Sequence, residues 1–334
     1  MTLILEYAFT FTHNVCALFG TTLNIYLIIL AWFKSPKSMK TYTILILNFA
    51  VMDLMGCLLD FLTEDRVIPG KETIAYVSFG PCRYAGPYLC WVLFGLLLTC
   101  LTHSLFSLCY SFYYRYRILH ADHPDAKRVL LSLAVIMIPS ALQTYGYIVS
   151  YDDPEVVRRK IAFQFPQYNL TGQTISGFRD LTDFRAWIPI LNCVVPIAPI
   201  YGGIFFFRYK ILHLLKEKSS MMSSETRNVH SQLLKILTYQ AIIPVCMLLG
   251  MGLFALSMFD IHHHEDQEYC TMVFNVLLPV LSPIVYILCL TPYRRFTYRL
   301  FKKVTGNKVE PVAKISTRNG YSSGTNPAHT VTKN

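Results

Sequence analysis

Residues 11–33 read FTHNVCALFGTTLNIYLIILAWF and contain no Asp, Glu, Lys or Arg. A helix of about 20 apolar residues crosses the hydrocarbon core of a bilayer, because it satisfies its own backbone hydrogen bonds there. This stretch therefore predicts a membrane-spanning helix. No basic residue precedes it and no small-residue cleavage site follows it, so we expect the helix to be retained and not removed as a signal peptide.

Six further stretches have the same length and apolar character, at residues 42–62, 84–110, 129–149, 187–207, 233–259 and 269–290. Apolar residues make up 53% of the chain and charged residues only 15%, whereas roughly a quarter of a soluble domain is charged. No repeat relates one stretch to another, which disfavours the repeat-built transporters. We predict an all-α fold, a seven-transmembrane helical bundle.

The distribution of basic residues predicts the orientation of the bundle in the membrane. Of the 30 Lys and Arg residues, 22 lie on the side of the C-terminus and 8 on the other side. Because Lys and Arg gather in cytoplasmic loops, the N-terminus is expected outside. The sequon at Asn169 lies on that outer side and predicts glycosylation there. The charge of +10 is distributed between the spans, which disfavours a nucleic-acid partner and predicts the lipid bilayer as the surroundings.

After the last span, residues 293–303 alternate aromatic and basic side chains. They predict a short amphipathic helix on the anionic inner leaflet. Residues 304–334 are rich in Ser, Thr, Asn and Gly and have too little apolar surface to fold alone. We predict a seven-transmembrane domain with an amphipathic eighth helix over residues 1–303 and a disordered cytoplasmic tail over residues 304–334.

Polar side chains inside the spans are costly in hydrocarbon, so each needs a reason. Span one carries Asn24, span two carries Asn48 and Asp53, and span seven carries Ser282. Two interpretations are open for them. Their hydrogen bonds hold the helices together, or they form one network that rearranges between two states.

Prolines in the spans favour the second interpretation. Span seven ends in Ser282-Pro283-Ile284-Val285-Tyr286, where proline removes a backbone hydrogen bond and creates a hinge. Pro244 lies inside span six. We predict a conformational switch built from Asn24, Asp53, Pro244, Pro283 and Tyr286.

At the inner end of span three, residues 113–117 read YYRYR. The Arg115 guanidinium, between Tyr114 and Tyr116, can donate to a carbonyl or carboxylate of a cytoplasmic partner. The alternative is a cationic anchor within an aromatic belt at the membrane surface. The residues alone favour neither.

Cys82 and Cys270 lie at the outer ends of spans three and seven, in an oxidising compartment. They are candidates for a disulfide, the alternative being free thiols. The long outer loop, residues 150–186, contains no cysteine.

His262-His263-His264-Glu265-Asp266 offers metal-binding side chains, but consecutive residues rarely converge on one ion, so we expect a solvated turn and no metal. The letters GYSSG at residues 320–324 match a hydrolase motif that requires a strand, a turn and a helix. The tail offers neither strand nor helix. No phosphate-binding loop is present, and we predict no cofactor and no enzymatic activity.

The chain also resembles a known family, the nematode serpentine chemoreceptors of the Str superfamily, most closely the serpentine receptor class delta group. The resemblance covers nearly all seven spans. The motifs that carry it are Ser35-Pro36-Lys37-Ser38-Met39, residues 45–53, Arg66-Val67-Ile68-Pro69, Gly80-Pro81-Cys82, Tyr114-Arg115-Tyr116, Leu237-Thr238-Tyr239-Gln240 with Pro244, and Pro292-Tyr293-Arg294-Arg295.

This resemblance implies a G-protein-coupled receptor in the plasma membrane, in the cilia of sensory neurons, that detects a small environmental molecule or pheromone and activates a heterotrimeric G protein. Asn24, Asp53 and Arg115 look like three residues typical of rhodopsin-like receptors, and Ser282 to Tyr286 looks like a variant of their Asn-Pro-x-x-Tyr motif. Tyr114 replaces the usual acid before the arginine.

An adhesion or scaffold protein is disfavoured, because the outer segments are short and include no folded ectodomain. The alternative function is a ligand-gated channel or small-molecule transporter, and insect odorant receptors of that kind have the opposite topology. The ligand is expected among the outer helix ends, near aromatic residues such as Tyr88 and Trp91.

Overall fold

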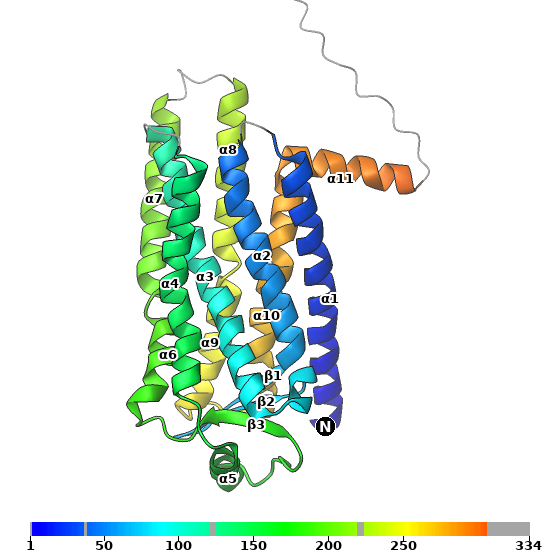
Figure 1. The fold of residues 1–334 in the computed structure, drawn as a ribbon, viewed down its shortest axis with the longest axis vertical. Helices are drawn as coiled ribbons and strands as arrows, with labels where there is room; N and C mark the ends of the chain where they lie inside the picture. Colours follow the sequence, from blue (N-terminus) through cyan, green and yellow to red (C-terminus); the bar gives the residue numbers. More distant parts are fainter. Residues whose placement is uncertain (1, 37–38, 121–123, 219–223, 306–334) are drawn as a thin grey trace, which may run out of the picture. The chain divides into compact units, whose positions relative to one another are not determined.

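The computed structural model describes residues 2–36, 39–120, 124–218 and 224–305. Within them, seven helical spans are long and apolar enough to cross a membrane, which confirms the predicted bundle (Figure 1). The spans are α1 (Thr2–Lys34), α2 (Lys40–Thr63), α3 (Pro87–His120), α4 (Ala126–Val149), α6 with α7 (Phe184–Val194 and Ile197–Glu217), α8 with α9 (Ser224–Ile242 and Val245–Met258), and α10 (Glu265–Cys289).

Proline divides the fifth and sixth spans. Pro196 separates α6 from α7, and Pro244 separates α8 from α9. Proline has no N–H to donate and its ring crowds the preceding turn, so the helix is interrupted there. Helix α10 continues through Pro279 and Pro283 without a break in its assignment.

A cap of mixed structure closes the bundle at the end where the N-terminus lies (Figure 1). It consists of β1 (Asp65–Pro69), β2 (Ile74–Ser78), β3 (Thr174–Phe178), the short 3-10 helix η2 (Pro81–Tyr84) and α5 (Pro154–Gln164). The strands pair antiparallel in the order β1-β2-β3. We call these five elements the cap.

The sheet of the cap is buried on both faces, which explains why the sequence did not predict it. Tyr76 and Val67 pack on the bundle, whereas Val77 and Ile68 pack beneath α5. Each strand has five residues, and β1 and β2 are buried throughout. A strand without an exposed face lacks the alternation of apolar and polar residues that identifies strands in a sequence.

Helix α11 (Thr291–Val304) follows the last span, so a helix lies where the basic and aromatic run predicted one. Its first turn contributes Tyr293, which is buried and shares a hydrogen bond of 2.6 Å with Ser35. Of the tail predicted to be disordered, residues 304–334, those from 306 on lie outside the described residues.

Candidate functional site

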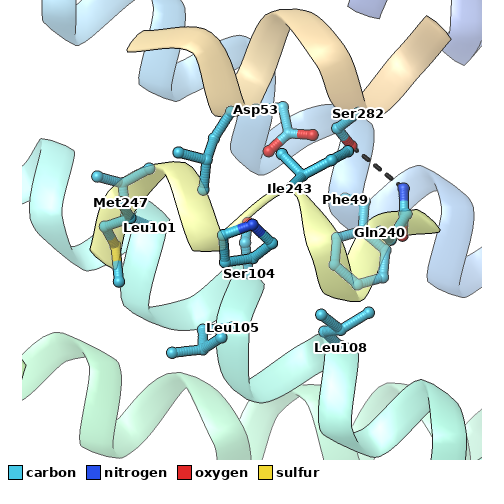
Figure 2. A pocket seen from close by; sticks show the side chains of 12 residues that line it. Phe49, Asp53, Leu101, Ser104, Leu105, Leu108, Gln240, Ile243, Met247 and Ser282 are labelled. Atoms are coloured by element: carbon cyan, nitrogen blue, oxygen red, sulfur yellow. Dashed lines mark hydrogen bonds between the residues drawn. The ribbon is translucent and has the colours of Figure 1, made fainter. Parts of the chain in front are cut away.

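A cavity lies in the middle of the bundle, between α2, α3, α8, α9 and α10 (Figure 2). Its volume is about 40 Å³. Most of its wall is apolar, with polar atoms from Asp53, Ser104, Gln240 and Ser282. Because Pro244 is also part of the wall, the cavity adjoins the break between α8 and α9.

Gln240 connects α8 to α10 beside this cavity. Its Nε2 donates to Ser282 Oγ at 3.3 Å, and its Oε1 accepts from the Tyr286 hydroxyl at 2.9 Å. Tyr286 has no exposed surface. The Asp53 carboxyl lies next to Ser282 (Figure 2), and its Oδ2 has no hydrogen-bond partner among the described residues. Movement of α8 away from α10 must break the two Gln240 bonds.

Asn24 compensates for the hydrogen bond that Pro283 cannot make. In an α-helix the N–H of one residue donates to the carbonyl four residues earlier, so Pro283 leaves the Pro279 carbonyl without its usual partner. Asn24 Nδ2 donates to this oxygen at 2.8 Å and also to Gly20 O at 2.9 Å. The predicted residues Asn24 and Pro283 are thus brought together at one carbonyl.

Arg115 is buried near the opposite end of α3 from the cap. Its exposed fraction is 5%, and its guanidinium carbon lies 5.0 Å from the centre of the Tyr42 ring. Tyr114 stacks on the same ring, with centroids 6.2 Å apart. No carboxylate pairs with Arg115 among the described residues, and its second terminal nitrogen has no hydrogen bond there. A ring face therefore takes the place of an acid.

Comparisons with known proteins assign the chain to a family. Residues 9–299 match the family described as "Serpentine type 7TM GPCR chemoreceptor Srd". The chain is 37% identical to serpentine receptor class delta-19 of Caenorhabditis elegans, over 96% of each chain, and 39% identical to class delta-18, over 86% of each.

The chain belongs to the serpentine receptor class delta family. It is a multi-pass membrane receptor of that family and not an enzyme. The crystal structure of squid rhodopsin superposes with a TM-score of 0.59 at 14% identity, covering 91% of this chain and 88% of that one. The fold of this class delta receptor is accordingly the rhodopsin-like seven-helix bundle.

The predicted disulfide partner of Cys82 was wrong. In the structure Cys82 pairs with Cys90, their Cα atoms 5.3 Å apart, and Cys270 is a free, exposed thiol. Span three begins at Pro87 and not at residue 84. The chain turns at Gly86, whose φ of +107° suits glycine, and this turn folds η2 back onto the first turn of α3.

Three further predicted positions lie in or below the cap of the receptor. Asn169 is exposed, and its Oδ1 accepts from the Thr171 N–H at 3.2 Å. Tyr88 is exposed and packs edge-on against Tyr151. Trp91 is completely buried under the sheet. Neither aromatic residue lines the central cavity.

Sequence reasoning missed a buried ionic cluster that joins the cap to α10. Arg66 of β1 donates from Nε to Glu268 at 2.7 Å and from its first terminal nitrogen to the Tyr269 hydroxyl at 2.8 Å. Its guanidinium also lies 4.7 Å from the Tyr168 ring centre and 4.4 Å from that of Tyr269. Arg66 and Glu268 are 3% and 1% exposed. The sequence signals were the position of Arg66 soon after a span and its place in the motif Arg66-Val67-Ile68-Pro69.

A second buried group of titratable residues lies where α1 and α2 meet the cap. His13 Nδ1 and Asp60 Oδ2 share a hydrogen bond of 2.9 Å, and the two side chains are 0% and 3% exposed. Asp65 accepts from the Ser78 hydroxyl. Burial raises the pKa of the Asp65 carboxyl from 3.8 to about 7.

Proposed function

We propose that this chain is a chemosensory receptor which detects a small environmental molecule and activates a heterotrimeric G protein. The observation that carries the proposal is Arg115, buried against Tyr42 with no acid partner among the described residues. A guanidinium that packs on a ring is released at lower cost than one in a buried ion pair. When the bundle opens, Arg115 becomes a donor for the carbonyl or carboxylate of a G protein.

The cap supports an outer position for this end of the bundle. It carries the exposed sequon at Asn169 and the Cys82–Cys90 disulfide, and both suit the extracellular side. The basic loops lie at the opposite end, toward the cytoplasm. In this orientation residues 1–303 form the receptor domain, α11 lies at the inner leaflet, and the family resemblance supports a position in sensory cilia.

Activation is an outward swing of α8 about the break at Pro244. In the described state Gln240 holds α8 to Ser282 and Tyr286 of α10. The swing breaks these bonds and opens the cleft beside Arg115. A ligand shifts this equilibrium by no more than its difference in affinity for the two states.

The test is a comparison of Arg115→Ala with Arg117→Ala, two residues further along the same helix. Cells expressing each variant with a panel of G proteins are exposed to uncharged odorants, and G-protein dissociation is recorded. Arg115→Ala abolishes the response while surface expression, measured with an N-terminal tag, is unchanged, and Arg117→Ala retains most of it. A full response from Arg115→Ala refutes the coupling mechanism.

Membrane topology distinguishes this receptor from a channel or transporter whose N-terminus lies in the cytoplasm. A glycosidase shift that is present in the wild type and absent in Asn169→Gln, with a C-terminal tag protected from protease in intact cells, supports the outer position of the cap. A protease-accessible C-terminal tag contradicts it, and ligand-evoked ion currents are then the signal to measure.

A further inference from the structure

Two clefts adjoin the loop of the cap that connects α5 to β3. Their volumes are about 480 and 430 Å³, within the range of about 300–1,000 Å³ that is typical of sites for small molecules. The same part of the loop lines both of them, namely Tyr168, Asn169, Leu170 and Thr171. The asparagine of the sequon therefore belongs to the wall of both clefts.

The larger cleft lies between this loop, α1, β1 and α10. Glu6 of α1, Arg66 of β1 and Glu265 of α10 belong to its wall. Gln167 and Gln173 extend the wall on either side of the sequon. Carboxylate and side-chain amide groups exchange hydrogen bonds with hydroxyl and N–H groups. The larger cleft is thus suited to a polar guest that is rich in hydroxyl groups.

One acceptor in the wall of the larger cleft has no partner. The amide oxygen Oε1 of Gln173 is shielded from solvent and makes no hydrogen bond among the described residues. A buried acceptor without a hydrogen bond is destabilising. A hydroxyl or amide N–H group of a guest beside Gln173 satisfies this oxygen.

The smaller cleft, between the loop and α5, offers fewer free groups. Its cation Arg158 already donates to Leu170 O and, from its second terminal nitrogen, to Gln173 O at 2.7 Å. Its Nε also lies 3.4 Å from a carboxylate oxygen of Glu155. Within the described part of the chain, no side chain of this wall has a buried polar atom without a hydrogen bond. The larger cleft is therefore the better site for a guest.

We propose that the innermost N-acetylglucosamine of a glycan on Asn169 lies in the larger cleft and bridges the loop to α1 and α10. Its hydroxyl and acetamido N–H groups donate to the Gln173 amide oxygen and to the carboxylates of the wall. The sugar is attached covalently to the wall, so its effective concentration is high and weak contacts hold it. The inference rests on the proposed outer position of the cap.

The bound sugar acts on the contact between the cap and α10. Arg66 and Glu265, both in the wall, form an ion pair in which a guanidinium nitrogen lies 3.2 Å from a carboxylate oxygen. The Glu265 side chain is 25% exposed. A sugar in the cleft keeps water away from this pair, and the attraction between two charges is stronger where water is excluded. The glycan therefore stabilises the attachment of the cap to α10.

The experiment measures how fast peptide N-glycosidase F removes the glycan from the purified full chain in lipid nanodiscs, without denaturant. The enzyme must reach the bond between Asn169 and the sugar, so it acts while the sugar is out of the cleft. Gln173→Leu removes the acceptor and raises the rate about fivefold, the factor that corresponds to one hydrogen bond. Gln164→Leu is the matched control. Gln164 lies outside both clefts and accepts from the Lys71 N–H at 3.1 Å, so its replacement leaves the rate unchanged.

Thermal unfolding provides a second test that needs no change at Gln173. The protein is produced in cells that make only high-mannose glycans, and endoglycosidase H trims each glycan to its innermost sugar. The trimmed protein keeps the melting temperature of the intact one, whereas Asn169→Gln lowers it by about 2 °C. In the Asn169→Gln background, Gln173→Leu has no further effect, because the sugar that it contacts is missing.

Equal rates of removal in the wild type and in Gln173→Leu overturn the proposal. Equal melting temperatures of the trimmed protein and of Asn169→Gln also overturn it. In both cases the glycan is present, and the proposed topology stands. A wild-type protein that carries no glycan even when denatured overturns this proposal together with the proposed use of the sequon, so the two failures are distinguishable.

Discussion

Replacing Arg66 by Met removes the cation of the buried cluster between the cap and α10 while keeping a long side chain. Glu268 then stays buried and keeps Tyr168 and His263 as its partners among the described residues, at 2.9 and 3.1 Å. Removal of one member of a buried ion pair costs about 3–5 kcal/mol, because the other charge is left without compensation. For a chain of this size, such a loss lowers the melting temperature by roughly 6–10 °C.

The measurement is thermal unfolding in nanodiscs, followed by tryptophan fluorescence. Arg83→Met is the matched control, because Arg83 is exposed in the same cap and contacts its neighbour Tyr84; it changes stability by about 0.5 kcal/mol or less. The double variant Arg66→Met with Glu268→Gln loses less than the two single variants together, by about 2 kcal/mol. Additive losses in this cycle refute the argument that the two charges stabilise each other.

Three further outcomes are expected in the same unfolding assay. Asn24→Leu costs about 1–2 kcal/mol, since the Pro279 carbonyl loses the Asn24 amide as its donor, whereas Asn14→Leu, whose amide donates to Thr10 O of the same helix, costs clearly less; equal losses contradict the role of Asn24. Cys90→Ser costs about 2 kcal/mol by reopening a short loop, and Cys270→Ser leaves stability unchanged; the reverse order contradicts the observed pairing. Because the folded state binds the Asp65 proton up to about pH 7, stability falls as pH rises from about 4 to 7, and Asp65→Asn removes that part of the slope; an identical slope in the variant contradicts the burial argument.

The side-chain contacts of the predicted switch could not be derived from local sequence patterns. Asn24, Pro283 and Tyr286 were predicted as one switch because polar and kinked positions in hydrocarbon are rare. That Asn24 meets the Pro279 carbonyl, 255 residues away, depends on the rotation of two helices about their axes. Gln240, which joins Ser282 to Tyr286, was noticed only as part of a family motif. Helix rotation is set by the packing of the whole bundle.

The sequence by itself determined the seven spans and the sides of the membrane on which the loops are expected, because hydropathy and the distribution of Lys and Arg are read from neighbouring residues. Only the tertiary structure decided the cap, the Cys82–Cys90 pair and the contact of Arg66 with Glu268. Each of these features pairs residues that are distant in the chain or separated by a turn. Local sequence patterns do not choose the partner, because many other residues of the same type fit the same pattern. The bundle selects among them because a buried charge or carbonyl is less costly in an arrangement that gives it a partner.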